Sequence, residues 1–84
     1  MYTVLTEKHA EKDLKSLPKE IYHGIIRELI SLKNNPRPHN CRKLTGSKND
    51  WRIRIGTYRV LYEIDDHNRI VRVYRVKHRK EAYL

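Results

Sequence analysis

The segment from Trp51 to Tyr62 constrains the fold of this 84-residue chain more than any other part of it. It reads Trp-Arg-Ile-Arg-Ile-Gly-Thr-Tyr-Arg-Val-Leu-Tyr, with alternating apolar and basic residues around a Gly-Thr pair. A period of two is typical of a strand with one buried face, and glycine at the first position of a two-residue loop favours a type II′ turn. The segment is therefore predicted to be a β-hairpin that turns at Gly56 and Thr57.

Counting outward from this turn predicts which residues face each other. Arg54 is opposite Arg59, and Arg52 lies on the same face, because directly opposed residues share a face of the sheet. Like charges in opposed positions are destabilising, whereas guanidinium groups bind phosphate oxygens well. The arginine face therefore indicates an anion site, with a merely solvated face as the alternative. The other face carries the apolar residues Trp51, Ile53, Ile55, Tyr58, Val60 and Tyr62.

The overall charge favours a polyanionic partner. The chain has 19 lysines and arginines against 10 aspartates and glutamates, a formal net charge of +9. RNA, DNA, an anionic membrane or an acidic protein would suit such a charge. There is no apolar run of membrane-spanning length and no N-terminal signal, so we expect a cytoplasmic protein without membrane contact. One cysteine, Cys41, and five histidines without metal-ligand spacing predict no disulfide, no metal and no cofactor.

The N-terminal half is predicted to be mostly helical. A short strand is expected over residues 2–6, with Thr6 as the N-cap of a helix over residues 7–16. Pro18 suits the first turn of a second helix, because its missing N–H costs little there. The face of that helix expected to cover the hairpin carries Ile21, Ile25, Leu29 and Leu32.

The C-terminal half is predicted to be a meander of strands. Residues 43–44 would add a short strand before the hairpin, and a turn at residues 65–68 would lead to a last strand over residues 70–76. We therefore expect one α+β domain over residues 1–84 in the order β-α-α-β-β-β. Two N-terminal helices would pack on one face of a small antiparallel sheet.

The last strand is expected to bring more polar side chains to the arginine face. In the simplest register Tyr74 lies opposite Arg59, with Arg72 on the same face. Continued alternation would turn His78 toward this face and Arg79 away from it, unless the strand ends or a bulge intervenes.

The chemistry that such a face could perform is cleavage of RNA by the neighbouring 2′-OH. This reaction needs substrate positioning, charge stabilisation and proton transfer, but neither a metal nor a water molecule. His78 and Tyr83 are the nearby groups suited to proton transfer, because the pKa of arginine exceeds ~12. The three glycines are isolated, so no glycine-rich phosphate loop is present, and no Ser/His/Asp motif is recognisable.

Three motifs resemble the RelE/ParE superfamily of bacterial toxins, on the RelE side. They are Lys43-Leu44-Thr45-Gly46, the hairpin from Trp51 to Ile64, and Val76-Lys-His-Arg79 with Tyr83. The resemblance implies a toxin of a type II toxin–antitoxin system with a fold similar to that of small microbial RNases. RelE-like members are ribosome-dependent endoribonucleases, which enter the A site, cleave the mRNA codon there and stop translation.

The same resemblance implies roles for individual residues. Arg59 and Arg79 would hold the scissile phosphate, Tyr83 would stack on or orient the nucleotide, and His78 would be a candidate acid or base. The residues expected to bind RNA are Arg52, Arg54 and Lys77.

The implied partners are the ribosome with its mRNA and an acidic, RelB-like antitoxin that covers the basic face. Operator DNA would be bound only by the toxin–antitoxin complex. Two alternatives remain open: a ParE-like, non-enzymatic inhibitor of DNA gyrase, and a non-toxic homologue that acts only as a partner or repressor subunit. The combination of the arginine face with His78, Arg79 and Tyr83 favours the RNase, because gyrase poisoning needs no RNase site.

Overall fold

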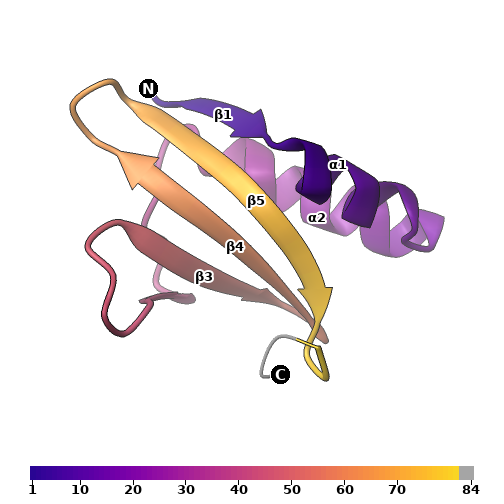
Figure 1. Cartoon of the computed structure of the whole chain (residues 1–84). Coiled ribbons are helices and arrows are strands. Elements are labelled where there is room, and N and C mark those ends of the chain that lie inside the picture. Colours follow the sequence, from indigo (N-terminus) through magenta and orange to yellow (C-terminus); the bar gives the residue numbers. More distant parts are fainter. Residues whose placement is uncertain (82–84) are drawn as a thin grey trace.

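The computed structural model describes residues 1–81 as seven elements (Figure 1). They are β1 (Thr3–Thr6), α1 (Lys8–Lys15), α2 (Lys19–Ser31), β2 (Cys41–Lys43), β3 (Asp50–Ile55), β4 (Tyr58–Asp65) and β5 (Ile70–His78). The expected α+β class and β-α-α-β-β-β order are confirmed, with the three-residue β2 as an additional edge strand. Over this part of the chain, no helix is long and apolar enough to cross a membrane.

The sheet is mixed, so the expectation of a purely antiparallel sheet is wrong. Its strand order is β1-β5-β4-β3-β2, and the strands from β2 to β5 pair antiparallel. β1 instead pairs parallel with β5, with Thr3 opposite Ile70 and Thr6 opposite Val73. A parallel neighbour requires a long crossover connection, and the two helices provide one because they carry the chain from β1 to β2 at the far edge.

The hairpin has the register predicted from its sequence. Arg54 is opposite Arg59, and Ile53 is opposite Val60. The φ of Gly56 is 60°, and Thr57 has no positive φ, as a type II′ turn requires. The turn residue therefore fixes which side chains share a face.

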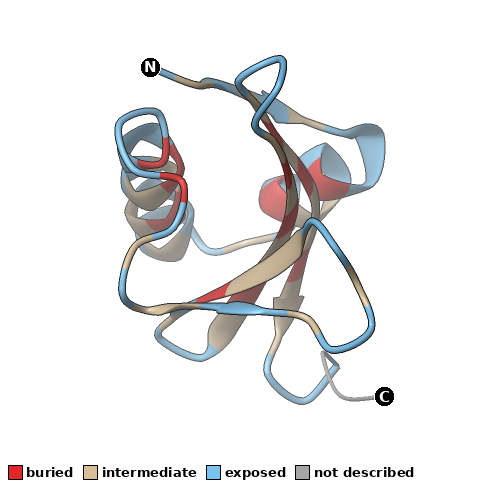
Figure 2. Ribbon diagram, turned by 90° about the vertical axis from the view of Figure 1, so that its left-hand side faces the viewer, coloured by how far each residue is buried: buried red, intermediate tan, exposed pale blue. Residues whose placement is uncertain are grey.

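Both helices pack on the apolar face of the sheet and form one core with it. Figure 2 shows the buried residues, in red, on the strands and on the helix sides that face them. This confirms the expected partnership between the second helix and the hairpin, although Ile21 is only half-buried. The core residues are Ala10, Leu14, Ile25, Leu29, Leu32, Ile53, Val60, Tyr62, Ile64, Val71, Val73 and Val76.

The helix starts differ by one residue from those expected. Thr6 ends β1 rather than capping α1, because the amide of Glu7 still donates to the carbonyl of Val73 at 2.8 Å. Glu7 is the N-cap and makes no side-chain capping bond. Pro18 is the N-cap of α2, and its carbonyl accepts the amide of Tyr22 at 2.9 Å.

Tyr62 connects the sheet to the loop that follows α2. Its side chain is fully buried, and its hydroxyl donates to the carbonyl of Pro36 at 2.8 Å. Burial raises the pKa of Tyr62, so the phenol stays protonated and keeps donating. Pro36 is itself buried, so loss of the Tyr62 hydroxyl would leave its carbonyl without this hydrogen-bond donor.

We predict that Tyr62→Phe lowers the free energy of unfolding by ~1–3 kcal/mol, because a buried carbonyl is left without its donor. Urea denaturation measures this change. The exposed Tyr22 provides the control, and Tyr22→Phe should leave the urea midpoint unchanged. Equal midpoints for both variants and the parent protein would contradict the assigned role of the Tyr62 hydroxyl.

Candidate functional site

Three cationic residues lie side by side across the central strands. Arg54 of β3 is opposite Arg59 of β4, which is in turn opposite Lys77 of β5. The next row, two residues or about 6.6–6.8 Å further along, places Arg52 opposite Arg42 of β2. These five residues (Arg42, Arg52, Arg54, Arg59 and Lys77) form the basic face, on the side of the sheet away from the helices.

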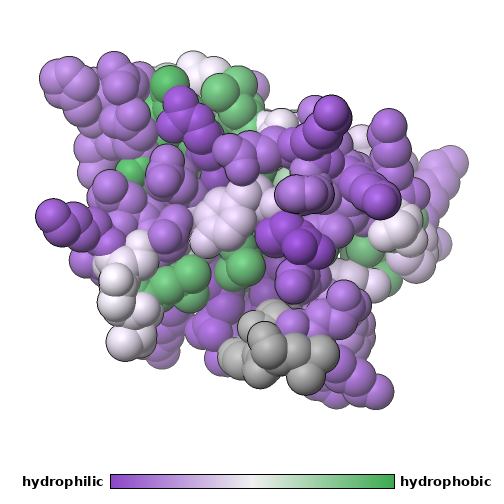
Figure 3. Space-filling model, in the orientation of Figure 1, coloured by the Kyte–Doolittle hydropathy of each residue, from purple (hydrophilic) through white to green (hydrophobic). Residues whose placement is uncertain are grey.

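Figure 1 looks onto this side of the sheet, with α2 behind it. Figure 3, in the same orientation, shows that the side chains here are mostly hydrophilic. The neighbouring residues of β4 that point the other way, Val60 and Tyr62, are fully buried in the core. A single strand thus has an apolar side against the helices and a cationic side away from them.

Arg59 is the unusual member of the basic face, because it is only 8% exposed. Its Nη1 donates to the carbonyls of Gly56 at 3.2 Å and Tyr58 at 3.0 Å. Its Nε is buried without a hydrogen-bond partner. The ion pairs among residues 1–81 are Arg37–Asp66, Arg72–Glu63 and Arg75–Asp13, and none includes Arg59.

A buried cation with an unsatisfied N–H is costly, because burial removes its charge from bulk solvent and none of the ion pairs among residues 1–81 includes Arg59. A phosphate group beside Arg59 would supply both an acceptor for the N–H and an opposite charge. Arg54 and Lys77 flank the same place from the neighbouring strands. The geometry and the charge of the row therefore suit the binding of a phosphate.

A β-bulge changes the predicted register of the last strand. Tyr62 pairs with Val73 but Leu61 pairs with Arg75, so Tyr74 is the extra residue. The expectation that Tyr74 lies opposite Arg59 is therefore wrong, and Lys77 occupies that position. The turn is also one residue later than expected, since β5 begins at Ile70 and residues 66–69 form the loop.

The bulge also decides the orientation of His78, which alternation alone left open. Beyond the bulge the alternation is inverted, so His78 pairs with Tyr58 on the opposite face from Lys77. The two rings meet edge to face, with centroids 5.3 Å apart. The Nδ1 atom of His78 accepts the amide of Lys80 at 3.2 Å. His78 is therefore not part of the row that contains Arg59.

Arg79 follows the end of β5 and is held beside the hairpin turn. Its amide donates to the carbonyl of Thr57 at 2.7 Å, which extends the pairing of Tyr58 with His78 by one step. Its side chain is exposed. Tyr83, the remaining candidate, lies outside the described residues.

Tyr74 and Arg72 belong to the acidic end of the sheet rather than to the basic face. Arg72 pairs with Glu63, and their charged groups are 3.6 Å apart. Burial raises the pKa of Tyr74, and the Asp50 carboxylate raises it further. Both residues lie on the side of the sheet expected from the sequence. Their neighbours there are the carboxylates of Glu63 and Asp50 rather than the cations of the basic face.

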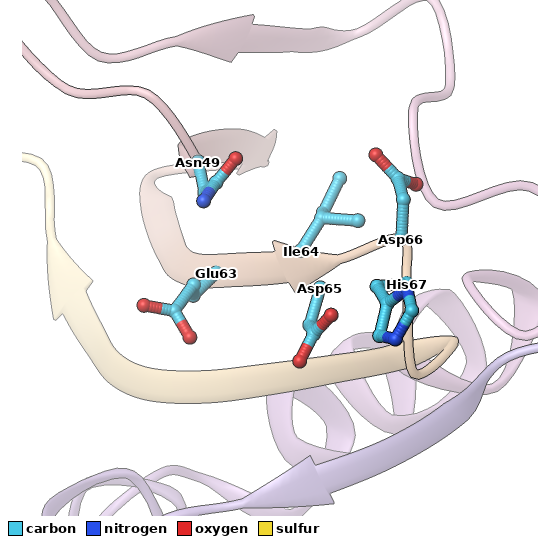
Figure 4. Close-up of a pocket in the computed structure, with 6 residues that line it drawn as sticks. All are labelled: Asn49, Glu63, Ile64, Asp65, Asp66 and His67. Carbon is cyan, nitrogen blue, oxygen red and sulfur yellow. The ribbon is translucent and has the colours of Figure 1, made fainter.

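A hollow of about 430 Å³ lies at this acidic end. Figure 4 shows the carboxylates of Glu63, Asp65 and Asp66 spread along the end of β4 and the next turn. Asp66 is paired with Arg37 at 2.7 Å, and hydrogen bonds from Arg37 and Tyr2 lower its pKa to about 2. No candidate site residue lines this hollow. Among residues 1–81 there is no group of three His, Cys, Asp or Glu side chains that could hold a metal ion.

Arg42 is the residue of the basic face that the sequence did not indicate. Strand β2 covers residues 41–43, whereas the short strand was expected at residues 43–44. Three residues are too few to show a period of two. Without a register for β2, the position of Arg42 opposite Arg52 could not be predicted.

The chain matches known toxins over nearly its whole length. Residues 4–83 match the family described as ParE toxin of type II toxin–antitoxin system, parDE. Toxin RelG of Mycobacterium tuberculosis is 36% identical over 87 residues, covering 98% of this chain and 95% of that relative. Toxin RelE3 of Methanocaldococcus jannaschii is 36% identical over 84 residues, covering 95% and 93%.

The same similarity holds for the fold. The crystal structure of an archaeal RelE–RelB complex from Pyrococcus horikoshii superimposes with a TM-score of 0.85 and 29% identity. The match covers 95% of this chain and 97% of the chain in that structure. The identities and the fold together support the resemblance that the motifs indicated.

We predict that inorganic phosphate raises the thermal midpoint of the protein, because a ligand that binds only the folded state stabilises it. The increase should be lost in Arg59→Gln, which keeps a polar side chain but removes the buried charge. Arg27, exposed on α2, provides the matched control, and Arg27→Gln should respond to phosphate as the parent does. An equal phosphate response in Arg59→Gln would contradict a phosphate site at Arg59.

Proposed function

This chain belongs to the ParE toxin family of type II toxin–antitoxin systems, within the RelE/ParE superfamily, and we propose that it is a RelE-like endoribonuclease. In this proposal it enters the ribosomal A site and cleaves the mRNA there, which stops translation. The observation that carries the proposal is the buried, incompletely paired Arg59 between Arg54 and Lys77. A gyrase inhibitor without catalytic activity has no need of a buried cation between two further cationic residues.

The proposed reaction is attack by the 2′-OH on the adjacent phosphorus. A bond forms between the 2′ oxygen and phosphorus while the bond to the 5′ oxygen breaks, leaving a cyclic phosphate and a 5′-OH. Negative charge grows on the phosphate oxygens in the transition state, and preorganised guanidinium groups stabilise it. Arg59 would make the closest contact, and Arg54, Lys77 and Arg79 would add charge around it.

The basic face has no side chain suited to proton transfer. Arginine is a poor base, and His78 packs edge to face against Tyr58 on the other face of the sheet. Tyr83 remains the candidate that the sequence offers for orienting the nucleotide and sharing in proton transfer. We therefore expect little cleavage by the isolated protein and a strong dependence on the ribosome, which would position the mRNA for in-line attack.

The second candidate function is ParE-like inhibition of DNA gyrase. The name of the matching family favours it, since that family is described by ParE. The individual relatives named above carry RelE and RelG names instead. The cation row and the position of Arg79 beside the hairpin turn fit phosphate chemistry, so the RNase is the preferred function.

The proposed partner is a RelB-like, acidic antitoxin. The Pyrococcus horikoshii structure is a complex of RelE with RelB, and this chain superimposes on its RelE fold. A net charge of +9 would favour an acidic polypeptide, and such a partner could cover the basic face. We propose that operator DNA is bound only by the resulting complex.

We predict that the Arg59→Ala/Arg79→Ala variant no longer arrests growth but still binds its antitoxin. Removing two groups that stabilise transition-state charge should reduce ribosome-dependent cleavage by ~10³-fold or more. Growth curves, a cleavage assay on programmed ribosomes and antitoxin pull-down measure the three effects.

The matched control removes two positive charges from the helices. Lys12→Ala/Arg27→Ala alters exposed residues of α1 and α2 and should leave growth arrest intact. Growth arrest that persists in Arg59→Ala/Arg79→Ala would rule out the RNase proposal.

A further inference from the structure

We propose that Asp13 is a positioning residue of this site. Its carboxylate holds β5 immediately after the bulge and thereby fixes Lys77 and Arg79 relative to Arg59. The catalytic consequence rests on the proposed function, whereas the effect on β5 is independent of it. Asp13 contacts no substrate in this proposal and acts through the strand that it holds.

The contacts of Asp13 join distant parts of the sequence. Its Oδ2 atom accepts the Nε–H of Arg75 at 2.9 Å and the backbone amide of Val76 at 2.9 Å. Its Oδ1 atom accepts the Nη2–H of Arg75 at 3.4 Å. One carboxylate therefore binds the side chain of one residue and the backbone of the next, directly after the bulge.

The ion pair is partly protected from solvent. The Asp13 side chain is 19% exposed, and the Arg75 side chain is 37% exposed. Asp13 lies on α1 one residue before Leu14, which is buried in the core. The carboxylate is thus held by a helix whose position is set by core packing, and it can transmit that position to β5.

This part of β5 needs a partner because β1 has ended. The last residue of β1 paired with β5 is Thr6, opposite Val73, and the last backbone bond runs from Glu7 to Val73. Beyond Val73, β4 lines one side of β5, while the chain on the other side has turned into α1 (Figure 1). An amide at such an edge requires an acceptor, and Asp13 supplies it for Val76.

The position of β5 is least constrained by strand pairing at the bulge. A bulge interrupts the hydrogen bonds between the two strands locally and bends the strand. Burial of Val76 opposite Val60 selects the bulged register, since Arg75 would otherwise take that core position. Asp13 adds hydrogen bonds from α1 to Arg75 and Val76, the two residues that follow the bulge. Lys77, one residue beyond Val76, then lies opposite Arg59.

The expected effect of losing this contact is on the chemical step. A misplacement of about 1 Å in a catalytic arrangement can cost 10²-fold in rate. Asp13→Ala should therefore lower kcat for ribosome-dependent cleavage by ~10-fold or more, with KM changed less, because most RNA contacts remain. Hydrogen exchange of the amides of residues 76–79 should accelerate, while exchange in β3 stays as in the parent.

Two further variants separate positioning from stability. Asp13→Asn keeps an oxygen that can accept the amide of Val76 but loses the charge that attracts Arg75, so its kcat should lie between the parent and Asp13→Ala. Glu11→Ala removes a carboxylate from the same helix that accepts a hydrogen bond from the hydroxyl of Thr6 at 3.4 Å. It should match the parent in kcat and in exchange.

The kcat and hydrogen-exchange measurements are made at a temperature where circular dichroism shows that every variant is folded. Asp13→Ala with kcat within twofold of the parent, or with unchanged exchange at residues 76–79, would overturn the proposal. A parent protein that cleaves no RNA on ribosomes would instead refute the proposed function. The exchange data on the same variants would still test whether Asp13 holds the strand.

Discussion

The register of β3, β4 and β5 is the constraint on which the basic face depends. It is set at two places, the tight turn at Gly56 and the bulge at Tyr74. The turn aligns Arg54 with Arg59, and the bulge brings Lys77 into the same row. Because side chains alternate along a strand, an error of one residue at either place would move the cations to the apolar side. Local backbone features thus determine where positive charge gathers.

The cationic row is possible because the other side of the same strands is a well-packed core. Ile53, Val60 and Val76 point toward the helices from the three strands that carry the row, and they are almost completely buried. Opposed like charges and a buried guanidinium both oppose folding. Their presence in a small domain supports the proposal of a functional site here, since functional sites often retain interactions that reduce stability.

The parts of the fold that were predictable from the sequence are those fixed by local pattern. Alternation and the Gly-Thr turn sufficed for every pair of the hairpin, and helical spacing sufficed for α2. The parallel pairing of β1 was not predictable, because a four-residue strand shows no preference for its neighbour. Arg42 was missed for a similar reason, since β2 has three residues.

The valine spacing in the last strand is a sequence sign of the bulge, but the sequence alone did not identify it as one. The spacing from Val71 to Val73 is two residues and that from Val73 to Val76 is three, which breaks the alternation of a regular strand. The contact that accompanies this break comes from Asp13, far away in the sequence. The sequence therefore left the orientation of His78 open, and the basic face contains arginine and lysine but not His78.

Mapping the 5′ ends of cellular transcripts after induction of the protein tests most directly whether the basic face serves RNA cleavage. Cleavage of mRNA in the ribosomal A site should produce new 5′ ends inside translated codons, in frame with translation and absent from untranslated regions. Intact transcripts accompanied by DNA damage would contradict it and would indicate a gyrase inhibitor instead.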